Sequence, residues 1–266
     1  RMRNTPIIVF INKLDREGKD AFDLLDEVET KLGLHVTPLS WPVGMGQRFK
    51  GVYSLYEKNL ILFTPHGKQE DEDYFKITDL KDELLDNKVG TAAANELRDE
   101  INTIVSVYPD FTREDYLNGD ICPVFFGSAV NNFGVRELLD CFVDIAPNPL
   151  KRETEERIVL PEENKFSGFI FKIHANMDPK HRDRIAFLRI CSGKFERNTN
   201  YYHVRQNKYM KFPNPTAFMA SKKSVIDEAF PGDIVGLYDS GNFKIGDSIT
   251  EGEMLHFKGI PSFSPE

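Results

Sequence analysis

The stretch that decides the fold is TPIIVFINKLDREGKD, Thr5 to Asp20. Its apolar part, residues 6–11, is short, continuous and rich in β-formers, which predicts a strand covered on both faces. The chain then turns polar at Asn12-Lys13-Leu14-Asp15. Residues 20–33 carry apolar side chains at helical spacing and end at a glycine, which predicts a helix. A strand, a polar loop and a helix in this order are typical of an α/β fold.

Composition indicates a folded globular protein. The 266 residues are 40% hydrophobic and 29% charged, and they are numerous enough for two domains. Cys122, Cys141 and Cys191 are scattered without metal-ligand spacing, so we expect reduced thiols and no metal site. The net charge of −8 argues against nucleic-acid binding over the whole surface. No apolar run approaches the roughly 20 residues of a membrane span. We expect a cytoplasmic protein with neither DNA nor a membrane as its partner.

Residues 1–150 predict a parallel α/β core that carries an insertion. Residues 35–65 are rich in β-formers and are broken by proline and glycine, which favours short strands or hairpins. The acidic run at 68–75 indicates an exposed loop in the same insertion. Residues 79–107 predict helix, with Gly90 as a break between two pieces.

The remaining chain predicts one more strand–loop–helix unit and then a β domain. A second apolar run at 122–130 ends in Gly127-Ser128-Ala129, and an amphipathic helix closed by prolines follows at 134–149. The charged, proline-bearing segment 151–164 is typical of a linker. Residues 165–260 alternate short β-type runs with turn clusters and contain no convincing helix, which favours a small β-barrel.

The polar loop at 12–15 has the chemistry of a guanine site. A single carboxylate, that of Asp15, can accept both the ring N1–H and the exocyclic amine of guanine, a pair that adenine does not offer. Asn12 can tie neighbouring loops and reach the N7 side of the base, and the stem of Lys13 can lie along the base and ribose. Leu14 completes this loop. Ligands of open α/β sheets bind at such strand ends.

The second loop offers a backbone donor. Ser128 and Ala129 follow a buried-type strand, and small residues let the backbone approach a ligand closely. We expect the Ala129 amide to donate to the guanine carbonyl. The alternative is structural: Asn12 and Asp15 would only cap the following helix, and Gly127-Ser128-Ala129 would be a plain turn.

These motifs resemble the guanine-specificity motifs of the GTPase superfamily. The second half resembles the β-barrel of translational GTPases in FPGDIVGLYDSGNFKIGDSI, residues 230–249, and in LRICSGKFERN, residues 188–198. More narrowly, the chain resembles the bacterial release factor 3 family in NKLDRE, FKGVY, FIFKIHANMDPKHRDRIAFLRICSGKF and FKGIPSFSPE. The resemblance covers essentially the whole chain. Elongation factor G shares the plan but not the MDPKHRDR turn.

This resemblance implies a function in translation. It implies GTP or GDP as the ligand, Mg²⁺ in the complete GTP-binding domain, and the ribosome and class I peptide release factors as partners. The family releases and recycles class I release factors after peptide release. It also implies that residues 261–266 begin a linker to a third domain. Two other functions stay open: a fragment of another ribosomal GTPase, such as an elongation factor G relative, or a non-catalytic module that binds rRNA or protein.

The phosphate-binding motifs of this family do not occur in the 266 residues. There is no G-x-x-x-x-G-K-[ST] loop and no magnesium-binding threonine segment, and we assign no D-x-x-G run to the nucleotide switch of the family. We expect them in sequence upstream of Arg1, together with strands that would cover the sheet edge. No histidine lies in a catalytic context, so we assign neither catalytic nor metal-binding residues. We expect this chain alone to recognise guanine but not to hydrolyse GTP.

One segment of the β domain is basic. Between Asp178 and Lys223 there are eleven lysines and arginines and three acids, a local balance of +8. With interleaved Tyr201, Tyr202, Tyr209 and Phe212, this segment is predicted to contact rRNA. The alternative is a solvated surface whose aromatic residues belong to the core on alternate positions. The basic residues are Lys180, Arg182, Arg184, Arg189, Lys194, Arg197, Arg205, Lys208, Lys211, Lys222 and Lys223.

Overall fold

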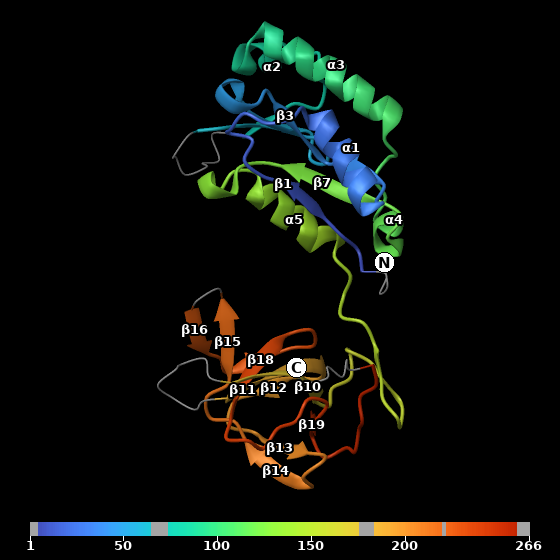
Figure 1. Ribbon diagram of the computed structural model, residues 1–266, viewed down its shortest axis with the longest axis vertical. Coiled ribbons are helices and arrows are strands. Elements are labelled where there is room, and N and C mark those ends of the chain that lie inside the picture. Colours follow the sequence, from blue (N-terminus) through green and yellow to red (C-terminus); the bar gives the residue numbers. More distant parts are fainter. Residues whose placement is uncertain (1–4, 65–73, 176–183, 220–221, 260–266) are drawn as a thin grey trace. The chain divides into compact units, whose positions relative to one another are not determined.

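The computed structural model describes residues 5–64, 74–175, 184–219 and 222–259 (Figure 1). Its contacts divide the chain into two compact units, Arg1–Ala146 and Pro147–Glu266. Among the described residues, no helix combines the length and the apolar character needed to cross a membrane. Each unit is described by itself.

A three-stranded parallel sheet forms the centre of the first unit. Its strands are β1 (Val9–Ile11), β7 (Cys122–Phe126) and β2 (Val36–Pro38), in the order β1-β7-β2. All residues of the central strand β7 are buried, whereas those of β1 are only half-buried. Val9 and Ile11 pack against one core and Phe10 against the other, so β1 contacts both layers as predicted, and its partial exposure follows from its place at the edge of the described sheet. An edge strand has a neighbour on one side only.

Helices cover both faces of this sheet. The side chains of β7 alternate: Val124 and Phe126 join the core beneath α1 (Ala21–Leu32), and Phe125 joins the core beneath α5 (Val135–Ile145). Figure 1 shows the two helices on opposite sides of the sheet. The predicted ends of α1 are confirmed: the Asp20 side chain accepts a hydrogen bond from the Phe22 amide, and Gly33 ends the helix in the left-handed conformation.

The predicted insertion is an antiparallel sheet covered by helices. Its strands are β3 (Ser40–Val43), β4 (Gly51–Ser54), β5 (Asn59–Leu62) and β6 (Tyr74–Lys76), in sequence order. A 3-10 turn, η1 (Gly46–Arg48), joins β3 to β4. Helices α2 (Glu83–Val89) and α3 (Thr91–Val107) meet at Gly90 as predicted, and the unpredicted α4 (Arg113–Asn118) follows. The acidic run 68–75 lies mostly outside the described residues.

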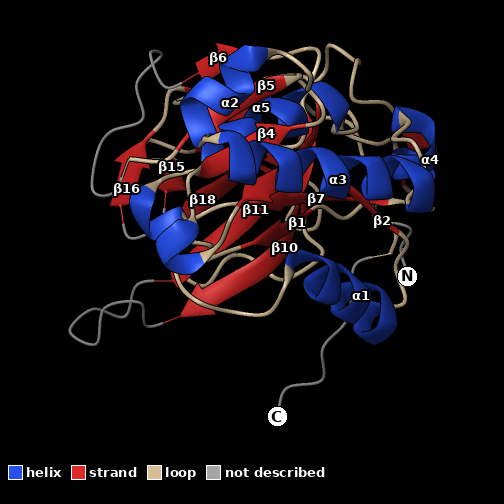
Figure 2. Ribbon diagram, turned by 90° about the horizontal axis from the view of Figure 1, so that it is seen from above, coloured by secondary structure: helices blue, strands red, loops and turns tan. Residues whose placement is uncertain are grey.

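The second unit is an antiparallel half-barrel, as the β-rich pattern predicted. Within its described residues every element is a strand (Figure 2). The large sheet has the order β14-β13-β19-β10-β11-β18-β15-β16, and β12 pairs with β17. The strands are β10 (Ser167–Ala175), β11 (Arg184–Ser192), β12 (Phe195–Glu196), β13 (Asn200–His203), β14 (Lys208–Lys211), β15 (Thr216–Met219), β16 (Lys222–Val225), β17 (Glu228–Ala229), β18 (Ile234–Asp239) and β19 (Ser248–Thr250).

The segment 151–164, for which the sequence predicts a linker, contains regular structure. It forms a hairpin, β8 (Arg152–Glu153) and β9 (Ile158–Val159), and Val159 is fully buried beside Phe169 and Leu255. The physical reason is that Arg157 pairs with Glu163 and Glu253, at 2.8 and 2.6 Å. Charges that look solvated in the sequence therefore hold the hairpin to the β domain.

Candidate functional site

The sheet brings the two predicted loops together. Because β1 and β7 are adjacent and parallel, with Ile11 opposite Phe126, their carboxyl ends lie at the same edge. The two segments remain hydrogen-bonded beyond the ends of the strands. The Gly127 amide donates to the Ile11 carbonyl at 3.0 Å, and the Leu14 amide donates to the Gly127 carbonyl at 3.1 Å. Residues 12–15 and 127–129 therefore lie side by side at one edge of the sheet.

Asn12 connects the two loops through its side chain. Its Oδ1 accepts hydrogen bonds from the amides of Lys13 and Ala129, both at 2.8 Å. Because Oδ1 is used in this way, Nδ2 is left to donate to a ligand. The Ala129 amide, which we expected to donate to a guanine carbonyl, donates here to Asn12, so a bound carbonyl would share or take over this donor.

Asp15 supplies the unsatisfied acceptor of the site. The residue is partly exposed, but its Oδ1 atom is shielded from solvent and has no hydrogen-bond partner among the described residues. A shielded carboxylate oxygen without a donor is unfavourable, because it has lost water without gaining a partner. The carboxylate that the sequence predicts as the guanine acceptor therefore has one oxygen without a hydrogen-bond donor among the described residues.

Two of the predicted site residues act as supports instead. The Leu14 side chain is 2% exposed and belongs to the main core of the first unit, and Ser128 is fully buried. Ser128 Oγ accepts a hydrogen bond from Asn131 Nδ2 at 2.8 Å. Lys13 is exposed and has a φ of +71°, a left-handed conformation that turns the chain sharply between the two neighbours. The loop therefore presents Asn12, Lys13 and Asp15, and buries Leu14.

Sequence reasoning missed the residues that hold the second loop. Phe133 is 2% exposed, and it both donates to and accepts from the backbone of Ser128, at 3.0 Å each. Gly127 lies so close to its neighbours that a Cβ atom there would be 2.3 Å from the Phe133 carbonyl oxygen and 2.7 Å from the Phe10 ring. Only glycine fits at this position. An aromatic residue six positions beyond Gly127 gives no periodic signal.

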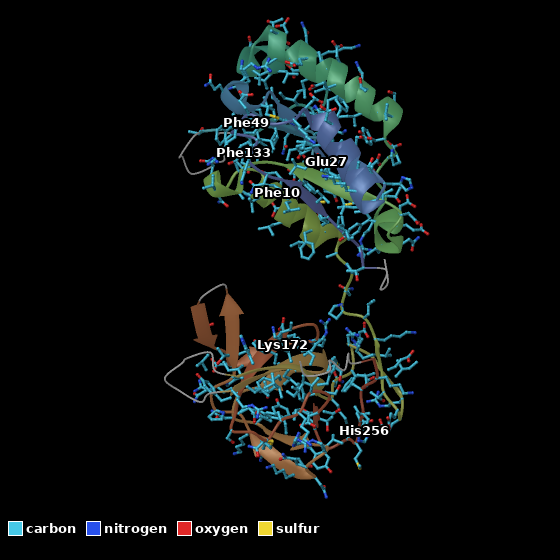
Figure 3. The ribbon with its side chains drawn as sticks, in the orientation of Figure 1. Phe10, Glu27, Phe49, Phe133, Lys172 and His256 are labelled. Atoms are coloured by element: carbon cyan, nitrogen blue, oxygen red, sulfur yellow. The ribbon has the colours of Figure 1, made fainter. Side chains whose placement is uncertain are left out.

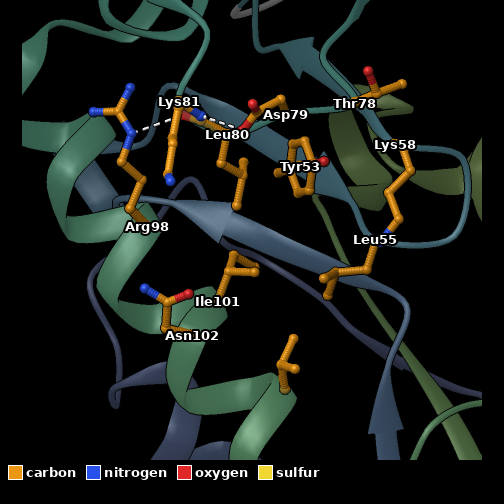
Figure 4. Close-up of a pocket in the computed structure, with 11 residues that line it drawn as sticks. Tyr53, Leu55, Lys58, Thr78, Asp79, Leu80, Lys81, Arg98, Ile101 and Asn102 are labelled. Carbon is orange, nitrogen blue, oxygen red and sulfur yellow. Dashed lines mark hydrogen bonds between the residues drawn. The ribbon is translucent and has the colours of Figure 1, made fainter.

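Other features of the structure lie apart from this site. A pocket of about 370 Å³ lies in the insertion, where Tyr53, Lys58 and Arg98 are among its lining residues (Figure 4). Among the described residues, one group has ligand atoms close enough for a metal: Glu155, Glu156 and His256. All three are exposed, and His256 Nδ1 pairs with Glu156 at 2.6 Å.

The positive charge of the basic segment in the β domain is partly neutralised in the folded structure. Four of its cations pair with acids, most of which lie beyond the segment: Arg184 with Asp239, Lys194 with Glu196 and Glu228, Arg197 with Asp227, and Arg205 with Asp247. Lys208 and Lys211 on β14 remain exposed without an ion pair among the described residues. Lys180 and Arg182 lie outside the described residues, as do the side chains of Lys222 and Lys223.

The aromatic residues of that segment divide between core and surface. Tyr201 and Phe212 are buried in the β-domain core, as the alternative interpretation predicted. Tyr209 is 62% exposed and packs against Tyr202 across the β13–β14 hairpin, with 5.3 Å between ring centroids. One face of this hairpin therefore carries Tyr202, Tyr209 and Lys211, whereas Lys208, which is also exposed, lies opposite the buried His203 on the other face.

Comparison with known proteins gives the same two-part division. Residues 1–148 match the elongation factor Tu GTP binding domain, and residues 165–252 match elongation factor G domain 2. A crystal structure of a Thermus thermophilus protein is similar in fold, with a TM-score of 0.63 and 18% sequence identity over 95% of this chain. The chain spans 37% of the length of that protein. The chain belongs to the translational GTPase family, with a GTP-binding domain of the elongation factor Tu type followed by domain 2 of the elongation factor G type.

Proposed function

We propose that the loops at 12–15 and 127–129 recognise the guanine base of GTP and GDP. The observation that carries this proposal is the shielded, unpartnered Oδ1 atom of Asp15, beside a loop that Asn12 ties to Ala129. Guanine brings two parallel donors to such a carboxylate. Asn12 Nδ2 is free to donate to N7, and the stem of Lys13 can cover the base.

We further propose that the chain is part of a termination factor of the release factor 3 family, which releases class I release factors from the ribosome. The sequence resemblance at 12–17, 169–195 and 257–266 supports this role, and with it a location in the cytoplasm. We retain residues 1–150 as part of the GTP-binding domain and 165–260 as domain 2. GTP hydrolysis and Mg²⁺ binding belong to the complete domain, and we assign no residue of this chain to either.

Guanine recognition is tested by the substitution Asp15→Asn. We expect this variant to lose about 100-fold in GDP affinity, because an amide cannot accept both donors, and to gain affinity for XDP, whose C2 carbonyl accepts from the amide. Calorimetry would measure both nucleotides, with ADP as the unrelated ligand. It would use this chain and a longer polypeptide that adds a phosphate loop ahead of Arg1.

Arg16→Gln is the matched control, because it changes a neighbouring exposed charge without touching the acceptor. It should leave the ratio of GDP to XDP affinity unchanged. If the longer polypeptide does not prefer GDP to ADP, or if Asp15→Asn leaves that ratio at its original value, the guanine site is wrong.

Ribosome contact is tested on the β13–β14 hairpin. The double substitution Lys208→Glu and Lys211→Glu should weaken binding to ribosomes and reduce its salt dependence, because each lysine that neutralises a phosphate releases a counterion. Lys151→Glu with Arg152→Glu is the control, since both residues are exposed on another part of the β domain. Equal effects of the two pairs would contradict a specific contact at the hairpin.

The termination role is distinguished from the elongation role by activity of the complete protein. Faster release of a labelled class I factor from post-termination ribosomes would support the proposal. Movement of tRNA through the ribosome without an effect on class I factors would favour an elongation factor G relative.

A further inference from the structure

The inserted sheet touches the first guanine loop through one turn, Gly44–Phe49. The Gly46 amide donates to the Leu14 carbonyl at 2.9 Å, and the Gln47 amide donates to Glu17 Oε1 at 3.3 Å. Gly46 has a φ of +60°, and a Cβ atom there would lie 2.2 Å from the Glu17 carboxylate. The turn and the loop are thus in direct backbone contact; the positive φ favours glycine at position 46, and a Cβ atom there would displace the Glu17 carboxylate.

The same turn supports the second guanine loop. Phe49, at the end of the turn, packs edge-to-face on Phe133, with 5.6 Å between ring centroids and an interplanar angle of 89°. Phe63 of the insertion contacts the Phe133 ring in the same way at 5.2 Å. Figure 3 shows Phe49 and Phe133 side by side in the first unit. Phe133 in turn holds the backbone of Ser128, which precedes Ala129.

Both contacts act on the atoms that would read the base. The Leu14 carbonyl belongs to the peptide group that connects Leu14 to Asp15. The hydrogen bond that it accepts from Gly46 therefore restrains the backbone that carries the Asp15 carboxylate. Phe133 pairs with Ser128 through both its amide and its carbonyl, so the residue that packs on Phe49 also holds the backbone directly before Ala129. Recognition through paired hydrogen bonds requires these groups to hold their relative positions closely.

We propose that the turn Gly44–Phe49 is a positioning element for guanine recognition, with Gly46 and Phe49 as its positioning residues. The inference rests on the proposed guanine site and goes beyond it, because it assigns part of the selectivity to an insertion that does not touch the base. The turn sets the spacing between Asp15 on one loop and Ala129 on the other.

The test compares Phe49→Leu with the matched control Phe75→Leu. Phe75 is also an aromatic residue of the insertion that packs on the same core, but it stacks beneath Lys88 instead of contacting Phe133. Hydrogen exchange of the nucleotide-free full chain is measured first. We expect Phe49→Leu to speed exchange of the amides at 128–133 and to leave β7 protected, and Phe75→Leu to do neither.

Nucleotide selectivity is the second measurement. Phe49→Leu should raise the Kd for GDP about three- to tenfold, the range of one edge-to-face contact, and should narrow the gap between GDP and ADP, because adenine offers no C6 carbonyl to the Ala129 amide. Phe75→Leu should lower the melting temperature less, because Phe75 is only partly buried, and should keep that gap. Unchanged exchange at 128–133 in Phe49→Leu overturns the inference. So does a gap between the GDP and ADP affinities equal to that of Phe75→Leu.

The first loop is tested by Gly46→Ala, with Gly90→Ala as its control. Both glycines have positive φ, +60° and +82°, but a Cβ atom at Gly90 meets only Lys50 Nζ at 3.6 Å. We expect Gly46→Ala alone to reduce the preference for GDP over IDP, and the added substitution Glu17→Ala to restore part of it by removing the clash. Equal selectivity in the two alanine variants overturns the role of Gly46. A wild type that does not prefer GDP to ADP would instead refute the guanine site itself.

Discussion

Asp247 is a buried carboxylate held entirely by donors of the β domain. Its side chain is 2% exposed and accepts hydrogen bonds from His203 Nε2 at 2.9 Å, from Arg205 at 2.6 and 2.8 Å, and from the Lys244 amide at 2.8 Å. Asp247→Ala would leave these donors unpaired, so we expect a loss of about 3 kcal/mol in the free energy of unfolding. Urea unfolding measures it.

Asp227→Ala is the control for Asp247, because its pair with Arg197 is exposed and should contribute less than about 1 kcal/mol. Equal effects of the two substitutions would contradict the assignment.

The contribution of Asp247 to the free energy of unfolding should decrease as the solution becomes acidic. Burial opposes its charge, but hydrogen bonds from Arg205 and His203 outweigh that effect and hold its pKa below the usual range. A lowered pKa in the folded state gives stability that is present above the unfolded pKa, about 3.9, and lost as the pH falls below it. The difference between wild type and Asp247→Ala should therefore shrink on acidification below about pH 4. A difference that stays constant down to about pH 2 would contradict this account.

At the scale of residues, the sequence shows where the polar side chains lie along the chain. It does not show which partners they find in hydrogen bonds and ion pairs. The positions of Asn12, Asp15 and Ala129 follow from strand ends and are visible in the sequence. The bond from the Ala129 amide to Asn12 spans 117 positions and depends on the β1–β7 register. The same limit explains the basic segment, because the acids that neutralise Arg205 and Arg184 come from the distant residues Asp247 and Asp239.

The hairpin β8–β9 shows how ion pairs can hold an element. Arg157 donates to Glu163 and Glu253 and also to the Ile158 carbonyl at 3.0 Å. Arg157→Ala should release the hairpin and speed proteolysis within 151–164, with a loss of about 1–2 kcal/mol because the guanidinium is one-third exposed. Arg152→Ala, on the same hairpin, should leave the cleavage rate unchanged. Equal protection of both variants would indicate that apolar contacts of Val159 suffice.

A second contact ties the hairpin to residues 254–258 and depends on pH. The Glu156 carboxylate raises the pKa of His256, and hydrogen bonds from His256 lower the pKa of Glu156 to about 2. The histidine contribution is full below its unfolded pKa, about 6.5, and is lost as the pH rises through its raised pKa. The glutamate contribution is present above about pH 4.3 and lost as the pH falls towards about 2.

We therefore expect the contact to be strongest between about pH 4.3 and 6.5, and to contribute less than about 1 kcal/mol because both groups are exposed. Unfolding of His256→Gln and wild type at about pH 5.5 and about pH 9 would measure this. The substitution should cost more at the lower pH. The opposite order would show that another group controls the pH dependence.

The sequence predicts those helices and strands whose hydrophobic pattern extends over many residues. Helix α1 has a cap, a stripe and a terminal glycine, and all three appear in the sequence. Helix α4 has only six residues, and β15 and β16 have four each, so they give too few repeats for a periodic signal. The sequence pattern places β2 in the insertion, because only Leu39 separates its three residues from β3. In the structure, β2 pairs with β7 in the parallel sheet.

On the scale of the whole molecule, the apolar residues form cores that respect the division of the chain. Two clusters take their members from the first unit and two from the second. A unit with its own core can unfold cooperatively by itself. We therefore expect two unfolding transitions, which makes the division into two units a measurable property.

Matched leucines allow this last expectation to be tested. Leu25 in α1 and Leu237 in β18 are both fully buried, so alanine at either position should cost about 2–5 kcal/mol through lost burial and the cavity left behind. Trp41, the single tryptophan of the chain, is fully buried in the first unit, so its fluorescence reports that unit alone. Leu25→Ala should lower the urea midpoint of the fluorescence transition. Leu237→Ala should leave that midpoint in place and shift only the part of the circular dichroism signal that comes from the β domain. If Leu237→Ala lowers the fluorescence midpoint as much as Leu25→Ala does, the two cores unfold together and the chain is one cooperative unit.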